Sequence, residues 1–289
     1  MKTEMSRAGI VTDTTACLPP GLAARYAIEV LTLDLVFENA VYRDGLTESS
    51  REFYETLASS RRPPTTGSPA PGAYAEAILR AGREAEAVLC ITVSRQFSAM
   101  HDAAMQGMAL AREQAPNLDI RVLDSGAAAM AQGFVALEAA RAAQEGAGIE
   151  QVIARAEALM PRVQLLVALD TLTYLGRSGR VPRLLIWASS PLQIKPIVVF
   201  HRGSYRPIGI VRTMRGATDR LFQALEQRTK AGDLHVCVHH TNAPDSAAAL
   251  AERVRTSLRP AELLVSEFTQ VMGVHTGPGL LGFAFYSGE

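Results

Sequence analysis

Short clusters of hydroxyl and carboxylate side chains follow apolar segments in the first half of this 289-residue chain. A hydroxyl group at the end of a strand can cap the next helix, or it can donate to an oxyanion beside the unpaired N–H groups of that helix. Capping is the simpler explanation for any single side chain, whereas four clusters together favour a site for an anionic group. The clusters are Asp13-Thr14-Thr15, Thr65-Thr66-Gly67-Ser68, Ser94 to Ser98, and Asp124-Ser125-Gly126.

The second half of the chain adds candidates of a different kind. His275 and Thr276 fall in the glycine-rich segment 273–279, where we expect a turn that lets the backbone approach a ligand closely. Arg180 follows an apolar strand and stands next to a glycine. Lys195 lies inside an apolar run, where an unpaired charge would be costly. These residues could hold or balance a negative charge.

The motifs of several enzyme classes are missing from the sequence. We find no GxxxxGK[ST] phosphate loop, no GxGxxG after a strand and no metal-ligand spacing, so we expect neither a cofactor nor a metal. A serine hydrolase or acyltransferase could use Ser94 or Ser98 with His275, but the GxSxG elbow is absent. A binding protein for another anionic small molecule is the second alternative. The residue set favours binding over turnover.

Composition narrows the class of protein further. Twenty-nine basic residues balance 29 acidic ones, so the chain has no electrostatic signature of a nucleic-acid-binding protein. No signal-peptide core and no apolar run near the ~20 residues of a membrane span is present, although transient membrane contact stays open. Cys17, Cys90 and Cys237 match neither a disulfide framework nor a zinc pattern, which favours a reducing compartment. We expect a cytoplasmic protein.

Alternating strands and helices predict an α/β protein of two domains with a ligand cleft between them. Residues 1–160 should form an α/β domain with a mostly parallel sheet, and residues 161–289 an α+β domain. Residues 29–37 alternate strictly and predict one half-buried strand, and residues 63–72 predict a loop. Strands are further expected at 9–12, 88–93, 120–123, 163–169, 194–200, 205–212, 234–240, 263–268 and 280–286, and helices at 47–60, 73–83, 98–114, 129–145, 149–160, 183–188, 214–230 and 244–257.

Eight short motifs occur in a fixed order over nearly the whole chain. They are Val11 to Thr15, Tyr42 to Gly45, Pro64 to Pro69, Ser94 to Ser98, Val122 to Ser125, Thr171 to Leu175 with Ser178-Gly179-Arg180, Ile194 to Ile197, and Val274 to Gly279. Each motif alone is weak, but together they resemble the DegV family. Characterised bacterial members of that family are the fatty-acid-binding subunits of fatty acid kinase.

The resemblance implies a ligand and a partner. A long-chain fatty acid would lie between the domains, and a separate kinase would phosphorylate its carboxylate. The carboxylate ligands implied here are Thr66, Ser94 or Ser98, and His275 with Thr276 beside it, with Arg180 as a supporting charge. Further cleft residues would be Asp13, Thr65, Asp124, Ser125 and Lys195, and the kinase would dock at Arg212 and Arg215, with Arg202 and Arg206 nearby.

Three departures from the family pattern bear on the site. Ser98-Ala99-Met100 replaces the usual Ser-Gly-Thr, Ser178-Gly179-Arg180 replaces Gly-Gly-Arg, and Cys17 replaces Asp.

A sixteen-carbon chain could contribute on the order of 10 kcal/mol through burial before association costs. We expect its apolar lining to come from helix 129–143 and from Leu169, Ile194 and Phe283.

Overall fold

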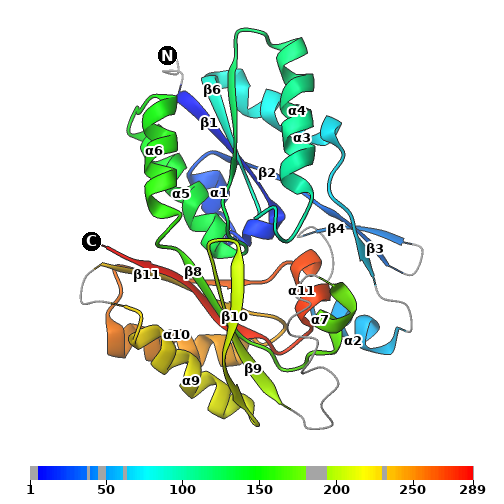
Figure 1. The fold of residues 1–289 in the computed structure, drawn as a ribbon, viewed down its shortest axis with the longest axis vertical. Helices are drawn as coiled ribbons and strands as arrows, with labels where there is room; N and C mark the ends of the chain where they lie inside the picture. The colour runs from blue at the N-terminus through cyan, green and yellow to red at the C-terminus, as the bar shows by residue number, and fades with distance from the viewer. Residues whose placement is uncertain are drawn as a thin grey trace. The chain divides into compact units, whose positions relative to one another are not determined.

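The computed structural model describes residues 6–37, 40–44, 50–60, 64–179, 194–229 and 233–288 (Figure 1). The chain divides into two units, which are Met1–Leu33 with Gly67–Val163 (unit 1) and Asp34–Thr66 with Gln164–Glu289 (unit 2). Segment 34–66 therefore belongs to unit 2, whereas the sequence analysis placed it in the N-terminal domain. No described helix has the length and apolar character needed to cross a membrane.

Unit 1 is built on a four-stranded parallel sheet in the order β2-β1-β6-β7. Seven of the eight residues of β6 are buried, as expected for a central strand that is covered on both faces. Helices α3 and α4 pack on one face of the sheet, and α5 and α6 on the other (Figure 1). The elements are β1 (Ser6–Asp13), η1 (Thr14–Ala16), α1 (Leu22–Arg25), β2 (Ile28–Leu31), α3 (Pro71–Ala81), η2 (Gly82–Glu84), β6 (Ala85–Thr92), α4 (Met100–Gln114), β7 (Asp119–Asp124), α5 (Met130–Gln144) and α6 (Ile149–Leu159).

Unit 2 contains a six-stranded mixed sheet in the order β10-β9-β8-β13-β11-β12, in which only β11 and β12 are parallel neighbours. Helices α9 and α10 contribute to its core, where Phe283 packs with Leu166 and Leu221. Phe283 is thus a core residue of unit 2, and its predicted role in lining a ligand site is not supported. The elements are β8 (Gln164–Ala168), β9 (Lys195–His201), β10 (Ser204–Val211), α9 (Met214–Glu226), β11 (Leu234–His240), α10 (Pro244–Leu258), β12 (Glu262–Glu267) and β13 (Leu281–Ser287).

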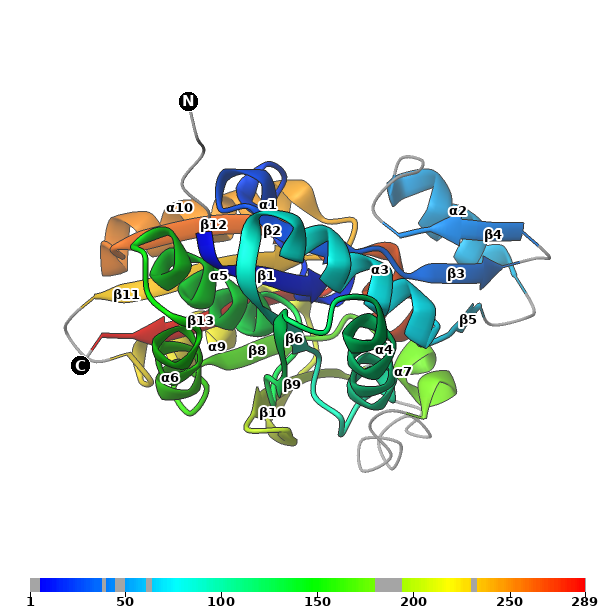
Figure 2. The same ribbon diagram turned by 90° about the horizontal axis from the view of Figure 1, so that it is seen from above.

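A second, smaller sheet of unit 2 has the order β4-β3-β5 and lies with α2 (Figure 2). Its strands are β3 (Asp34–Phe37), β4 (Ala40–Arg43) and β5 (Thr65–Thr66), and the nearby helices are α2 (Ser50–Ser59), α7 (Thr173–Ser178) and α11 (Gln270–Thr276). The predicted loop 63–72 therefore contains a short strand. The predicted helix 183–188 lies outside the described residues.

The predicted single strand 29–37 is wrong, because it is two strands that belong to different units. β2 pairs with β1, whereas β3 pairs with β4 and β5. Leu31, Leu33, Leu35 and Phe37 are all buried, so the alternation runs unbroken through the change of partner. A period of two reports which side chains are buried and carries no information about which strand is the neighbour.

Helix α11 is fixed in unit 2 by a side-chain cap and a close helix contact. Asp44 Oδ1 accepts a hydrogen bond of 3.0 Å from the backbone N–H of Val271, in the first turn of the helix. A Cβ atom at Gly273 would lie 1.7 Å from the hydroxyl oxygen of Tyr54 on α2, so only glycine fits at this contact. His275 follows two residues later, and its position therefore depends on this packing.

Replacing Gly273 with alanine should lower the free energy of unfolding by about 1–3 kcal/mol, because the new methyl group overlaps Tyr54. Gly72 on α3 is a matched control, since a Cβ atom there meets nothing within 4 Å. Urea titration should show Gly72→Ala as neutral or slightly stabilising, and Tyr54→Phe should partly rescue Gly273→Ala. Equal stability of the two alanine variants would rule out the close contact.

Candidate functional site

Two predicted site residues of unit 2 lie within hydrogen-bond distance of each other. Oγ1 of Thr66 is 3.0 Å from Nε2 of His275, although the residues are 209 positions apart in the chain. Both side chains are half-buried. One proton lies between these two atoms, so either the hydroxyl donates to Nε2 or Nε2–H donates to the hydroxyl oxygen. In the second arrangement the hydroxyl can donate its own proton to a further acceptor such as a carboxylate. We call these two residues the Thr66–His275 pair.

Secondary structure explains why Thr66 and not Thr65 contacts the histidine. Thr66 is opposite Leu35 in the small sheet and Thr65 is opposite Val36, so the two side chains point to opposite faces. Leu35 is fully buried, whereas Val36 is 45 % exposed. Thr65 is exposed with Val36, and its role in the site stays a prediction.

His275 lies in the last turn of α11 rather than in the turn that the sequence predicted. The turn begins at Gly277, whose φ of +76° is in the left-handed region that favours glycine. A Cβ atom at Gly277 would lie 2.2 Å from Cδ2 of Tyr174, so the Tyr174 ring packs directly against this turn. Thr276 donates its hydroxyl to the Met272 carbonyl within the helix. The glycines allow close packing after the histidine, and they leave the helix itself intact.

Lys195 is paired with Asp170, as the cost of an isolated charge in an apolar run requires. Its Nζ atom is 2.6 Å from the Asp170 carbonyl oxygen and 2.6 Å from Oδ1 of the same residue. A Cβ atom at Gly279 would lie 2.9 Å from Cβ of Asp170. Lys195 therefore connects the start of β9 to Asp170 in the segment after β8, and Asp170 in turn packs against the turn after His275.

The carboxyl ends of β1, β6 and β7 bring a second polar group together at one edge of the unit 1 sheet. Asp13 ends β1, Asp124 ends β7, and Ser94 follows β6. Because the three strands are parallel neighbours, these residues reach the same sheet edge, as the sequence analysis expected.

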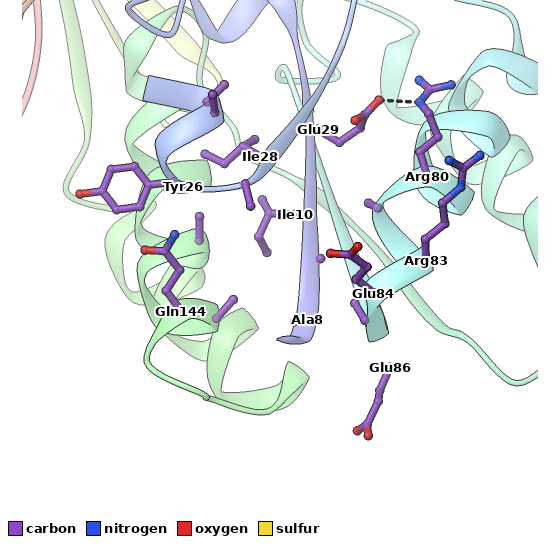
Figure 3. A pocket seen from close by; sticks show the side chains of 18 of the residues that line it. Ala8, Ile10, Tyr26, Ile28, Glu29, Arg80, Arg83, Glu84, Glu86 and Gln144 are labelled. Atoms are coloured by element: carbon purple, nitrogen blue, oxygen red, sulfur yellow. Dashed lines mark hydrogen bonds and ion pairs between the residues drawn. The ribbon is translucent and has the colours of Figure 1, made fainter. Parts of the chain in front are cut away.

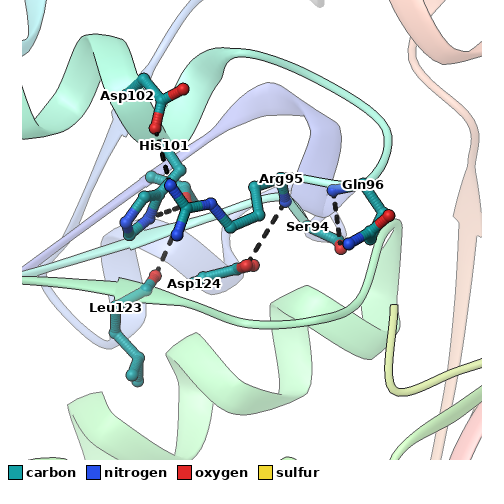
Figure 4. A network of polar contacts seen from close by, with 8 residues as sticks. Ser94, Arg95, Gln96, His101, Asp102, Leu123 and Asp124 are labelled. Carbon is teal, nitrogen blue, oxygen red and sulfur yellow. Dashed lines mark hydrogen bonds and ion pairs between the residues drawn. The ribbon is translucent and has the colours of Figure 1, made fainter. Parts of the chain in front are cut away.

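Hydrogen bonds at this edge engage several of the predicted residues in local turns of the chain. The Ser94 hydroxyl accepts from Gln96 N at 3.3 Å (Figure 4). The Ser125 hydroxyl accepts from Ala127 N at 3.2 Å, and Asp124 Oδ1 accepts from Gly126 N at 2.9 Å. Ser94 and Ser125 are almost fully buried. Ser98 is half-buried, and its role as a ligand donor stays a prediction.

Two side-chain contacts at this edge were not predicted from the sequence. Nδ1 of His101, in the first turn of α4, is 3.3 Å from the buried Thr92 hydroxyl, and Arg95 forms an ion pair of 3.0 Å with Asp102 (Figure 4). His101 was missed because a lone histidine in a helix gives no spacing signal.

Asp13 is 1 % exposed, and burial raises the pKa of its carboxyl to about 6. Its carboxyl group contacts the Thr15 hydroxyl, the Thr15 backbone N–H at 2.9 Å, and Nε2 of Gln132 at 3.2 Å. Gln132 is fully buried on α5 and was also missed. The available signal was an amide side chain within Met130 to Leu137, the otherwise apolar first half of an alanine-rich helix.

Three further predicted residues are arginines. Arg180 is outside the described residues. Arg212 and Arg215 are exposed on either side of the N-cap residue of α9, Thr213. In the described part of the chain, no group of three or more His, Cys, Asp or Glu residues could hold a metal ion.

A hollow of about 940 Å³ in unit 1 is lined by none of the predicted polar site residues, although Ala140 and Ala143 of the predicted lining helix 129–143 border it. It is lined at the amino ends of β1, β2 and β6 by alanines and by side chains that include Tyr26, Glu29 and Arg80 (Figure 3). Glu29 and Arg80 form an ion pair of 2.7 Å there. The hollow is therefore at the sheet edge opposite Asp13 and Asp124.

Comparison with known proteins identifies the family. The model of the DegV family, described as uncharacterised protein, matches residues 7–288. The chain belongs to the DegV family. A DegV domain-containing protein of Streptomyces coelicolor is 37 % identical over 281 residues, covering 96 % of this chain and 98 % of that protein.

Two solved DegV structures share the fold. A DegV family protein from Thermus thermophilus described by its fatty acid binding has a TM-score of 0.87 and 29 % identity, with 97 % of this chain and 99 % of that chain covered. Bacillus subtilis DegV, described as a fatty acid binding protein, has a TM-score of 0.85 and 28 % identity, with coverage of 98 % and 99 %.

Replacing Lys195 with methionine should destabilise this DegV chain by about 1–3 kcal/mol, because the Asp170 oxygens lose a charged donor. The control is Arg51→Met, which removes an ion pair whose side chains are 81 % and 65 % exposed. That change should cost less than about 0.5 kcal/mol in the same thermal denaturation experiment. If both variants have the same melting temperature, the contact between Lys195 and Asp170 does not stabilise the fold.

Proposed function

We propose that this DegV chain binds one long-chain fatty acid and holds its carboxylate at the Thr66–His275 pair. The contact between the two side chains carries the proposal, because it sets a hydroxyl and an imidazole side by side on half-buried residues. When a carboxylate enters, the bond between them gives way to a hydrogen bond from each group to the carboxylate. A carboxylate that leaves water must find donors or take up a proton. The hydroxyl and the imidazole can supply these donors in unit 2.

The pair contains no lysine or arginine, which suits an amphipathic ligand that is held mainly by its apolar part. Lys195, a cation of the same unit, is already engaged by Asp170 at 2.6 Å. Most of the affinity would then come from the acyl chain, at about 0.8 kcal/mol for each buried CH₂ group. The descriptions of the Thermus thermophilus and Bacillus subtilis relatives as fatty acid binding proteins support this ligand class.

Thr66→Val should weaken oleate binding about 10-fold to 100-fold, because one hydrogen bond to a charged group is lost while the side-chain shape is kept. The measurement is calorimetric or fluorescence titration of the delipidated protein. Thr65→Val is the matched control, since that neighbouring side chain is exposed on the opposite face, and it should bind as the parent chain does.

Oleyl alcohol provides a second control for the same proposal, because it keeps the hydrocarbon chain and lacks the carboxylate. Thr66→Val should leave its affinity nearly unchanged. Oleate affinity that is equal in Thr66→Val and the parent chain would show that the carboxylate lies elsewhere. Failure of the parent chain to bind oleate or palmitate at all would contradict the ligand class.

We further propose that a fatty acid kinase acts on the bound ligand. A carboxylate oxygen would attack the γ-phosphorus of ATP, the bond between that phosphorus and the β-phosphate oxygen would break, and ADP would leave. Arg212 and Arg215 are the proposed docking residues. Two cations at the start of α9 oppose the helix dipole, so they are placed unfavourably for stability, which favours a role in recognition.

The double variant Arg212→Glu/Arg215→Glu should abolish phosphorylation of bound oleate by the kinase and leave oleate affinity unchanged. Its melting temperature should equal or exceed that of the parent chain, since acidic residues suit a helix N-terminus. Arg255→Glu/Arg259→Glu, on the exposed end of α10, is the control and should be phosphorylated normally. Normal phosphorylation of the first variant would eliminate this docking surface.

A further inference from the structure

The carboxyl group of Asp13 lies in a closed network of hydrogen-bonding groups in unit 1. Oδ1 accepts from Thr15 N and contacts the Thr15 hydroxyl, and Oδ2 is 3.2 Å from Nε2 of Gln132. The same Nε2 is 3.1 Å from the Thr12 hydroxyl, which donates to the Ile91 carbonyl at 2.9 Å. Oε1 of Gln132 is 3.0 Å from the Thr15 hydroxyl.

The number of protons in this network decides the charge of Asp13. The Thr15 hydroxyl has one proton, yet it faces two acceptors, Asp13 Oδ1 and Gln132 Oε1. If Asp13 is ionised, one of these contacts joins two oxygens without a proton between them. If Asp13 is protonated on Oδ1, it donates to Thr15, Thr15 donates to Gln132, and every contact has a donor and an acceptor.

Turning the Gln132 amide over does not remove the conflict. Its oxygen would then face Asp13 Oδ2, and an ionised carboxylate would again meet an acceptor. The same oxygen would also face the Thr12 hydroxyl, whose proton is used by the Ile91 carbonyl. Only a proton on Asp13 satisfies the carboxyl contacts in both orientations.

We propose that Asp13 carries a proton in the folded chain in mildly acidic solution and acts as a proton-linked positioning residue for the segment that joins β6 to α4. The Val93 backbone N–H donates to the Asp13 carboxyl, and Val93 is the first residue of that segment. Ser94 N then donates to the Ala127 carbonyl at 2.9 Å, which joins the segment to the start of α5. Ionisation of Asp13 would leave a buried charge without a counter-charge next to Val93 and would weaken the hydrogen bonds that hold the segment between β6 and α4.

No cation balances such a charge in the described part of unit 1, where no side chain forms an ion pair with Asp13. The titratable groups that face it are Tyr74 on α3 and Cys90 on β6, and burial raises the pKa of both, so they stay neutral. The facing residues of α5 and η1, Gln132 and Thr15, do not titrate.

The direction of the pH effect follows from the raised pKa of Asp13, about 6 in the folded chain against an ordinary value of 3.8. The folded state binds the proton more tightly, so this group stabilises the fold fully below the unfolded pKa, and the contribution is lost as pH rises through about 6. The folding equilibrium constant should fall about 100-fold from this group alone across that range.

An effect of Asp13 protonation on ligand binding rests on the proposed function, because the segment between β6 and α4 contains Ser98, a predicted carboxylate donor. The test is made without ligand, so that failure of fatty acid binding does not affect it. In the delipidated full chain, the ¹³C resonance of the Asp13 carboxyl and the amide resonances of Val93 and Ser94 should titrate together. Their common midpoint should lie near pH 6.

Asp13→Asn keeps the side chain neutral at every pH and should remove the titration of the Val93 and Ser94 amides. Asp119→Asn, at the opposite end of β7 and 41 % exposed, is the control and should keep it. Titration of the Asp13 carboxyl below about pH 4 would overturn the proposal, as would a Val93 response that persists in Asp13→Asn. If that variant does not fold, the carboxyl resonance of the parent chain alone decides.

Discussion

The 3.0 Å contact between the Thr66 hydroxyl and the His275 imidazole joins segments that are 209 residues apart in the chain. It exists because segment 34–66 leaves the sheet of unit 1 and folds with unit 2. Three features hold the histidine in place. Asp44 caps α11, Gly273 lets α11 approach Tyr54, and Gly277 turns the chain beside Tyr174. Loss of any of these would move His275 while the Thr66 and His275 side chains themselves stay unchanged.

Hydroxyl, imidazole, amide and backbone groups make the contacts of the Thr66–His275 pair in unit 2 and of the Asp13 carboxyl in unit 1. In unit 2 the contact is between a hydroxyl and an imidazole, and the candidate cation Lys195 forms an ion pair with Asp170. In unit 1 the Asp13 carboxyl is surrounded by hydroxyl, amide and backbone groups. Under the proposed function, the Thr66–His275 pair would hold a carboxylate through directed hydrogen bonds, and most of the affinity would come from apolar burial. That division of roles fits an amphipathic ligand better than a small, strongly hydrated anion.

The sequence predicted the strands and long helices well, because their burial patterns are local. It failed where a partner was distant. The alternation from Leu31 to Phe37 is real, but the switch from β1 to β4 and β5 as neighbours leaves no trace in a period of two. Glycines near His275 predicted a turn, whereas Gly273 serves a helix contact with Tyr54 that no local pattern reveals. The ordered motifs predicted the family and the candidate residues, while the Gln132 partner of Asp13 became visible only in three dimensions.

Mass spectrometry of the purified full chain tests the central claim most directly. Spectra under native conditions should show one ligand per chain, and denaturation should release a single long-chain fatty acid in equimolar amount. Thr66→Val purified in parallel should retain less of it. A chain that carries no fatty acid, and that takes up neither oleate nor palmitate after delipidation, would contradict the account.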